Sequence, residues 1–231
     1  MKPINASRKA LTRLARGLPA SWYRDAKHHE KELNAFWYNN WIAVAREEEL
    51  IHPGDYRVVT LGSKSIVLLR AENHALRAYH NTCRHRGSRV CPTETGSSRR
   101  LTCPYHAWSY GLDGQLMMDP KAEFGLDRSQ LSLHPVKVRT VAGIVFVVLS
   151  DDPVDFEEAF STIERKLKPH GLERAKLAHK IDYVVKANWK LVFENNRECY
   201  HCPPNHKEYN LATYDVHRDN AVIDPKLRAE M

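Results

Sequence analysis

Two short pairs of cysteine and histidine, both within residues 83–106, constrain this chain more than any other part of its sequence. The first pair reads C-R-H and the second reads C-P-Y-H. Each pair puts one thiol and one imidazole on a tight turn, and the loop between the pairs has no hydrophobic periodicity. Gly87 and Pro104 follow ligands closely, as expected where a backbone bends around a buried metal. The four candidate ligands are Cys83, His85, Cys103 and His106.

Two cysteines and two histidines can bind either zinc or a 2Fe–2S cluster. Zinc fingers usually place Cys with Cys at one end of the motif and His with His at the other. Here each end supplies one residue of each kind. A cluster in which one iron takes both cysteines and the other takes both histidines needs such mixed loops. The spacing therefore favours an iron–sulfur cluster over zinc.

The complete pattern, C-x-H-x17-C-x2-H, resembles the Rieske motif, and so do R-G after His85 and P-Y-H-A-W around His106. Respiratory Rieske proteins carry two further cysteines, joined in a disulfide that braces the two loops. Ser88 and Tyr105 stand at the corresponding positions here. The motif is therefore similar to the Rieske domain of ring-hydroxylating and related oxygenases. Cys91, the remaining thiol nearby, is interpreted as a small buried hydrophobic residue.

A second group of candidate ligands lies in E-C-Y-H-C-P-P-N-H-K-E at residues 198–208. His201 and His206 are five residues apart, so they would point away from each other on a straight helix. The Pro-Pro break between them lets His206 fold back beside His201. Two imidazoles held in this way make up two-thirds of a 2-His-1-carboxylate iron site. Taken alone, the pair is equally compatible with solvated surface histidines, and the two neighbouring cysteines leave a zinc site open.

The longer stretch N-W-K-L-V-F-E-N-N-R-E-C-Y-H-C-P-P-N-H resembles the mononuclear-iron signature of Rieske non-haem iron oxygenases. The resemblance implies that His201 and His206 bind Fe(II). It also implies a catalytic role for Glu198, which would bridge this iron site to a Rieske histidine of a neighbouring subunit. Most ring-hydroxylating members have Asp at that place. A glutamate in this context is similar to the branch that acts on quaternary amines such as betaines, choline and carnitine. Ala107 departs from the glycine common in the family after the second cluster histidine, and we expect a small local adjustment there.

The family's third iron ligand is an aspartate on a helix that lies far beyond the position of Met231. We therefore expect the chain to be truncated at its C-terminus, and to be redox-active but inactive as an oxygenase by itself. Three aspartates lie in range of the two histidines, but their stretch reads as a loop and we do not assign them as ligands. They are Asp215, Asp219 and Asp224.

The resemblance implies the oxygenase component of a Rieske system. Electrons from NAD(P)H would arrive through a flavin/iron–sulfur reductase and pass by the 2Fe–2S cluster to a mononuclear Fe(II). There O2 would be used to hydroxylate or N-demethylate a small quaternary-amine substrate. The full-length protein would be a homo-trimer. Two alternatives stay open, namely an aromatic-ring-hydroxylating dioxygenase alpha subunit and a Rieske electron-transfer module without oxygenase activity.

Composition narrows the class of protein further. The 231 residues carry a net charge of +7, but the basic residues are scattered, so no nucleic-acid partner is expected. No apolar run reaches the length of a membrane span, so no membrane association is expected either. The odd cysteine count, spent mostly on ligands, indicates a reducing compartment and hence the cytoplasm. Residues 1–24 are basic enough for an organelle transit peptide, although a native N-terminal arm is the preferred interpretation.

The expected fold class is α+β. An N-terminal arm and helix over 1–40 precede an antiparallel β Rieske domain over 41–155. A linker helix and the beginning of a helix-grip catalytic domain follow over 156–231. Alternation and turn residues predict strands at 41–45, 56–61, 65–70, 76–80, 141–149 and 179–186. Helical spacing predicts helices at 25–40, with Leu33, Phe36 and Trp37 on one face, and at 156–167 and 187–201.

Overall fold

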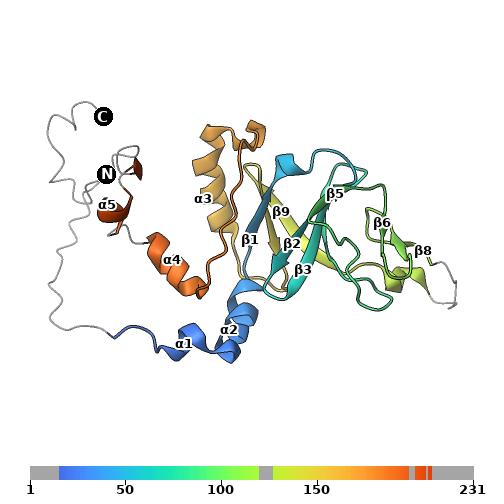
Figure 1. Ribbon diagram of the computed structural model, residues 1–231. Helices are drawn as coiled ribbons and strands as arrows, with labels where there is room; N and C mark the ends of the chain where they lie inside the picture. Colours follow the sequence, from blue (N-terminus) through green and yellow to red (C-terminus); the bar gives the residue numbers. More distant parts are fainter. Residues whose placement is uncertain (1–15, 120–126, 198–200, 207, 210–231) are drawn as a thin grey trace. The chain divides into compact units, whose positions relative to one another are not determined.

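The computed structural model describes residues 16–119, 127–197, 201–206 and 208–209 (Figure 1). Their contacts divide them between two compact units. One unit is Ala26–Ile181, and the other combines the described parts of Met1–Asp25 and Asp182–Met231. In the described part of the chain, no helix is both long enough and apolar enough to cross a membrane.

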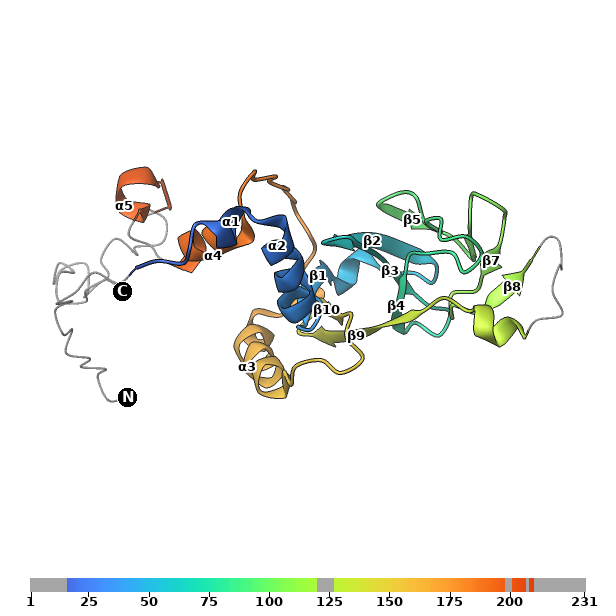
Figure 2. The ribbon, with the colours of Figure 1, turned by 90° about the horizontal axis from the view of Figure 1, so that it is seen from below.

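The larger unit is built on antiparallel β-structure, which confirms the expected fold class. Its main sheet has the strand order β1-β10-β9-β4-β3-β2-β5. The bounds are β1 Ile42–Arg46, β2 Asp55–Leu61, β3 Lys64–Arg70, β4 Leu76–His80, β5 Thr95–Ser97, β9 Pro135–Val141 and β10 Ile144–Val148. A second sheet, in the order β6-β7-β8, joins Leu101–Thr102, Ser109–Tyr110 and Leu116–Met118. This small sheet lies at the opposite end of the unit from α3, Glu157–Leu167 (Figure 2).

The interior strand β3 is apolar over residues 66–69, where both of its faces are covered. Successive side chains of a strand point to opposite faces. Val67 and Leu69 enter the core that also holds the candidate cluster cysteines, whereas Ile66 and Leu68 enter a second core with residues of β10. The strand therefore fixes the position of the small sheet's core relative to the main sheet.

A third core attaches α3 to the strands β9 and β10. Phe160 of α3 is 1% exposed, and its ring makes edge-to-face contacts with Trp41, Phe146 and Phe156. Burying one phenylalanine side chain stabilises a fold by about 1.5–3 kcal/mol. The helix predicted at 156–167 is confirmed, and one aromatic anchor holds it on the unit.

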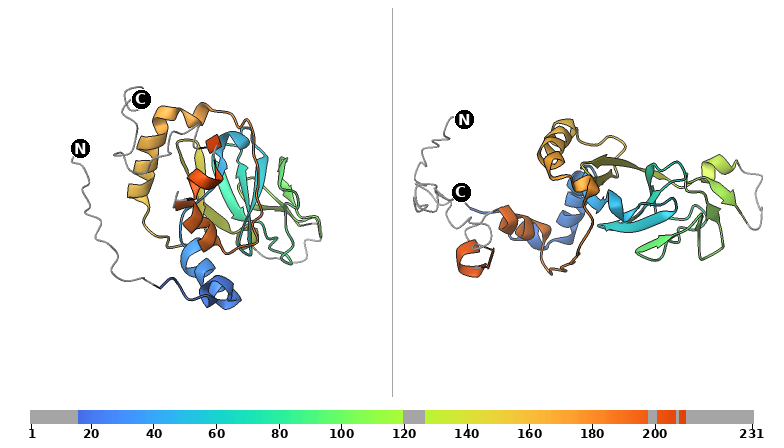
Figure 3. Two further views of the ribbon diagram at one scale, coloured as in Figure 1. Left: turned by 60° about the vertical axis from the view of Figure 1, so that its left-hand side comes forward. Right: turned by 90° about the horizontal axis from the view of Figure 1, so that it is seen from above.

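The remaining helical segments are short. They are α1 Ser21–Arg24, α2 Ala26–Glu32, η1 Leu33–Trp37, η2 Glu47–Glu49, η3 Arg128–Leu131, η4 Lys168–His170, η5 Leu172–Arg174, α4 Trp189–Arg197 and α5 Cys202–Asn205 (Figure 3). Segments α2 and η1 confirm the helix predicted at 25–40, but η1 is a π-helical turn. Phe36, expected on one face with Leu33 and Trp37, is 56% exposed. The wider π-turn changes the angle between successive side chains, so the expected face is not formed.

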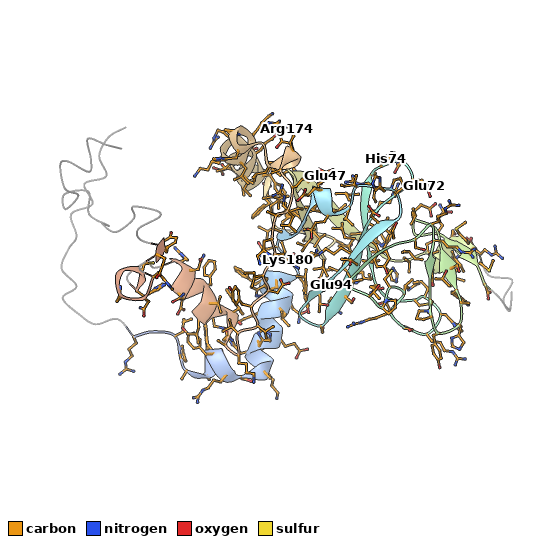
Figure 4. All side chains as sticks on the ribbon, turned by 45° about the horizontal axis from the view of Figure 1, so that its top comes forward. Glu47, Glu72, His74, Glu94, Arg174 and Lys180 are labelled. Atoms are coloured by element: carbon orange, nitrogen blue, oxygen red, sulfur yellow. The ribbon has the colours of Figure 1, made fainter. Side chains whose placement is uncertain are left out.

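One ion pair joins the irregular chain after η5 to the edge of the main sheet. The Glu94 carboxylate lies 3.3 Å from Arg57 of β2 and 3.7 Å from the Lys180 ammonium. Figure 4 labels Glu94 and Lys180, which lie next to each other at the edge of the sheet. Exposed ion pairs of this kind contribute about 0–1 kcal/mol each to the free energy of unfolding, so this contact adds little to the stability of the unit.

The strand predicted at 141–149 is confirmed over residues 144–148 but begins too early, and the strand predicted at 179–186 is wrong. The run 141–149 is not one strand, because Ala142 and Gly143 adopt φ values of +47° and +78° and turn the chain between β9 and β10. Two residues with positive φ are the requirement of a tight hairpin turn. Residues 179–186 form no strand, and Val184 within them is 94% exposed. Their β-branched residues predict a strand, but an isolated strand without hydrogen-bonded neighbours is not stable.

Candidate functional site

The four ligands predicted for the cluster come together at the end of the larger unit that carries the small sheet. The cysteines Cys83 and Cys103 are buried, and burial together with the nearby Cys103 thiol raises the pKa of Cys83. The rings of His85 and His106 are half-buried, with centroids 4.6 Å apart and planes at 72°. The structure therefore pairs cysteine with cysteine on the inside and histidine with histidine toward the surface.

The two ligand loops share one backbone turn, in which the carbonyl of the ligand cysteine accepts the N–H of the residue four positions later. The carbonyl oxygen of Cys83 accepts the N–H of Gly87, and that of Cys103 accepts the N–H of Ala107. Gly87 and Ala107 have φ values of +75° and +57°. Such a turn places the cysteine and the histidine of each pair close together, because it reverses the backbone within a few residues of the ligand cysteine. The local adjustment expected at Ala107 is thus a backbone in the left-handed region. Glycine adopts this conformation without strain, whereas alanine is strained by its Cβ atom.

Three aromatic side chains surround the ligands. Trp108 is buried and stacks on His85, with ring centroids 4.8 Å apart and planes at 9°. Tyr105 is exposed and lies 3.8 Å from His106, centroid to centroid. The Tyr110 hydroxyl lies 3.2 Å from the Sγ atom of Cys83. These contacts exclude water from one histidine and one cysteine and restrict the rotation of both.

Burial controls the electrostatics of the thiols. It raises the pKa of Cys83 above its ordinary value, and the hydrogen bond with Tyr110 acts in the opposite direction. Burial alone raises the pKa of Cys91 to about 12. Cys91 packs in the same core as the two ligand cysteines. Its predicted role as a small buried hydrophobic residue is confirmed.

The donor set fits a 2Fe–2S cluster. The Nδ1 atom of His85 is buried and has no hydrogen-bond partner among the described residues, which is costly unless that nitrogen binds something. The Nδ1 atom of His106 is buried as well. In the described part of the chain, no three His, Cys, Asp or Glu side chains meet closely enough to share one metal ion. A cluster divides its ligands between two irons, so the pairing of cysteines and of histidines suits it.

The second predicted pair is brought together in the smaller unit. The rings of His201 and His206 lie 5.3 Å apart, with planes at 82°. The two prolines between them do not break a helix. They occupy the first positions of α5, where a missing N–H is harmless. The N–H of His206 donates to the carbonyl of Cys202, and this single turn folds His206 back beside His201.

Helix α4 precedes this pair. The hydroxyl of Tyr23 donates to the Glu194 carboxylate at 3.1 Å, and the buried Lys190 ammonium lies 5.4 Å from the ring centroids of Tyr23 and Trp189. Glu198, the predicted bridging acid, lies outside the described residues, and so do Asp215, Asp219 and Asp224. The described residues provide no carboxylate that joins the two histidines as a third ligand.

Sequence reasoning missed the contributions of Trp108 and Tyr110. Both belong to the sequence W-S-Y, which follows the second ligand loop directly. If W-S-Y is extended, its first and third side chains lie on the same face. An aromatic residue at each of two alternate positions beside a metal loop is the signal that could have identified them.

Comparison with known protein families assigns both parts of the chain. Residues 40–150 match the Rieske [2Fe-2S] domain, and residues 172–224 match the catalytic domain of the ring hydroxylating alpha subunit.

Individual relatives agree with this assignment. The glycine betaine monooxygenase oxygenase subunit of Pseudomonas aeruginosa is 34% identical over 215 residues, which are 89% of this chain and 50% of the relative. The carnitine monooxygenase oxygenase subunit of Escherichia coli K12 is 34% identical over 202 residues, which are 84% and 53% of the two chains. The chain thus spans about half the length of these curated relatives.

A solved structure shows the same fold. The quaternary ammonium Rieske monooxygenase CntA, in complex with L-carnitine, superposes with a TM-score of 0.77 at 32% sequence identity. The match covers 84% of this chain and 56% of CntA. The chain thus carries a Rieske [2Fe–2S] domain together with part of the catalytic domain of a ring hydroxylating alpha subunit, and it is similar to Rieske monooxygenases over both parts.

Proposed function

We propose that the chain acts in the oxygenase component of a Rieske system that hydroxylates or N-demethylates a small quaternary amine. The observation that carries this proposal is the grouping of two buried cysteines beside two histidines whose Nδ1 atoms are buried. The names of the relatives, which act on glycine betaine and carnitine, support the substrate class.

The ligands would divide by residue type. Cys83 and Cys103 would bind one iron of the 2Fe–2S cluster, and His85 and His106 would bind the other. His201 and His206 would bind the mononuclear iron, with a carboxylate outside the described residues. When bound, the cluster supplies one-electron transfer and the mononuclear iron supplies O2 activation.

The chain's own residues prepare these sites. The Tyr110 oxygen accepts the N–H of Arg84 at 3.0 Å, and its hydroxyl would donate to the Cys83 sulfur, because a sulfur that binds iron is a thiolate without a proton. Trp108 covers one face of His85, which excludes water and fixes the plane of the ring. The exposed edge of the His85/His106 pair is where an electron-transfer partner can approach.

The partners belong to the proposal as well. A flavin/iron–sulfur reductase would deliver electrons from NAD(P)H, and the full-length protein would form a homo-trimer in the cytoplasm. Glu198 would connect His201 to a Rieske histidine of the next subunit, because an acid between two imidazoles can orient both through hydrogen bonds. The domain limits 1–40, 41–155 and 156–231 stay a prediction.

Electron paramagnetic resonance of the purified 231-residue chain tests the cluster. The reduced protein should show the low-field-shifted signal of a 2Fe–2S centre with mixed Cys/His ligation, with equal amounts of iron and acid-labile sulfide. The variants Cys103→Ser and His85→Cys should lose this signal, and Cys91→Ser should keep it. Stoichiometric zinc without acid-labile sulfide would rule the proposal out.

Substrate assays on the full-length protein test the rest. With reductase, NAD(P)H, Fe(II) and O2, quaternary amines should release formaldehyde in step with NAD(P)H oxidation, whereas aromatic hydrocarbons should yield no diol. Glu198→Gln should keep both metals and nearly stop turnover. Glu194→Gln, four residues earlier in the sequence, is the matched control and should keep most activity. Diol formation, or a fully active Glu198→Gln variant, contradicts the respective part of the proposal.

A further inference from the structure

Asn81 precedes the first candidate ligand, Cys83, by two residues and is only 1% exposed. Its side-chain amide uses every hydrogen-bonding position that an asparagine has. The oxygen Oδ1 accepts the backbone N–H groups of Val90 at 3.0 Å and Cys91 at 2.8 Å. The nitrogen Nδ2 donates to the carbonyl of Cys91 at 2.8 Å and to the hydroxyl of Ser65 at 3.2 Å. A saturated buried amide of this kind has one orientation only.

These bonds close the first ligand loop upon itself. Residues 81 and 91 are its two ends, and Cys83 and His85 lie between them. The backbone N–H of Asn81 also donates to the carbonyl of Ser65 at 2.9 Å. One side chain therefore joins both ends of the loop to each other and to strand β3.

The ends of the second ligand loop are joined by strand pairing and not by a side chain. Its ends are paired as strands, with Leu101 opposite Tyr110 and Thr102 opposite Ser109. The first loop leaves strand β4 at His80 and has no strand ladder across residues 81 and 91. The Asn81 amide replaces that ladder, since it supplies the backbone groups of Val90 and Cys91 with partners that a neighbouring strand would otherwise provide.

We propose that Asn81 is a positioning residue for the cluster, which closes the first ligand loop so that the protein itself fixes Cys83 relative to His85. The inference rests on the proposed function of these two residues as ligands. It assigns no contact with the cluster to Asn81. Its consequence is that loss of the amide should change the cluster's surroundings and its retention, beyond any change in the stability of the domain.

The variant Asn81→Leu, made in the whole 231-residue chain, tests this role. Leucine keeps the volume of the side chain but leaves two buried N–H groups and one carbonyl without partners. We expect a broadened or shifted resonance of the reduced cluster. We also expect iron to pass to a ferrous chelator about tenfold faster or more, measured well below the melting temperature.

Two controls separate loop closure from general destabilisation. Val145 is a buried residue of β10, so Val145→Ala creates a cavity in the core and should lower the melting temperature of the same unit. Asn73→Ala removes an exposed asparagine that caps its own turn through Ala75, 3.2 Å away. Both controls should keep the wild-type line shape and a chelation rate within about twofold of the wild type.

The outcomes distinguish this inference from the proposed function. A wild-type protein without a Rieske-type resonance contradicts the function. A normal wild-type resonance, with an Asn81→Leu variant that keeps both its line shape and its chelation rate, overturns the role of Asn81 alone. If Asn81→Leu does not fold, Asn81→Asp decides. Its carboxylate still accepts both N–H groups but loses both donations, so an intermediate rate is expected and an unchanged rate overturns the inference.

Discussion

The hydroxyl oxygen of Tyr110 lies 3.2 Å from the Sγ atom of Cys83 and accepts the backbone N–H of Arg84. A sulfur that binds iron is a thiolate without a proton, so the hydroxyl is the donor of this hydrogen bond. A hydrogen bond to a sulfur ligand stabilises the more negative, reduced state of an iron–sulfur cluster. The pair thus links strand β7 to the electron affinity of the site.

Tyr110→Phe should lower the reduction potential of the cluster. Losing one hydrogen bond to a charged group removes about 1.5 kcal/mol, which corresponds to about 60 mV for a one-electron couple. Spectroscopic redox titration of the 231-residue chain measures the shift. Tyr79→Phe is the matched control, since the Tyr79 hydroxyl donates to the Leu112 carbonyl instead and its loss should leave the potential unchanged. Equal potentials in Tyr110→Phe and wild type would contradict the assignment.

Ala107→Gly should stabilise the chain. Ala107 has a φ of +57°, where an alanine is strained by about 1–2 kcal/mol, and part of that gain is offset by the greater freedom of glycine in the unfolded state. A net increase of about 0.5–1 kcal/mol in the free energy of unfolding is expected from denaturant titration. Ala75→Gly, at an exposed position without positive φ, is the control and should not stabilise. Destabilisation by Ala107→Gly would show that the loop carries no such strain.

The bounds of the strands are predicted well where polar residues or glycines mark the turns between them. Gly62-Ser63 separates β2 from β3, and both strands were expected within a residue or two. The turn at Ala142-Gly143 was missed because it lies inside a continuous apolar run, and alanine gives no warning of a positive φ. The strand expected at 179–186 failed for the opposite reason. Its residues favour a strand, but propensity cannot supply neighbours for its backbone groups.

In the candidate site, the ligands were predictable from the sequence, whereas the residues that support them were not. The ligands were predictable because the chemistry of a cluster demands Cys and His at a fixed spacing. The approach of His206 to His201 was predictable because five residues with a Pro-Pro pair must turn. Asn81 and Tyr110 were not predictable, since each acts through a contact that depends on strands being folded together. Their residue types are common, and only their partners reveal their roles.

His80 should make the stability of the larger unit depend on pH. Burial lowers the pKa of His80, and the nearby His134 and Lys64 lower it further. The folded protein therefore resists protonation of His80, whereas the unfolded chain accepts a proton at an ordinary pKa of about 6.5. Stability is complete above that value and is lost as the pH falls from there through the lowered pKa of the folded state.

His80→Gln should reduce this loss. Chemical denaturation at about pH 7.5 and pH 5.5 should show a smaller drop in the free energy of unfolding for the variant than for the wild type. His179→Gln, at an exposed position, is the control and should follow the wild type. Identical pH dependence of His80→Gln and wild type would exclude His80 as the responsible group.

Two phenylalanines on different helices should differ strongly in how much their substitution destabilises the chain. Phe160 of α3 is 1% exposed and contacts three aromatic rings, so Phe160→Ala should cost about 3–5 kcal/mol of unfolding free energy. Phe193 of α4 is 52% exposed, and Leu191 and Val192 beside it are also exposed. Contiguous exposed apolar side chains favour association. In the 231-residue chain, Phe193→Ser should therefore cost less than about 1 kcal/mol and reduce aggregation measured by light scattering. A large loss of stability in Phe193→Ser would show that α4 buries this side chain in solution.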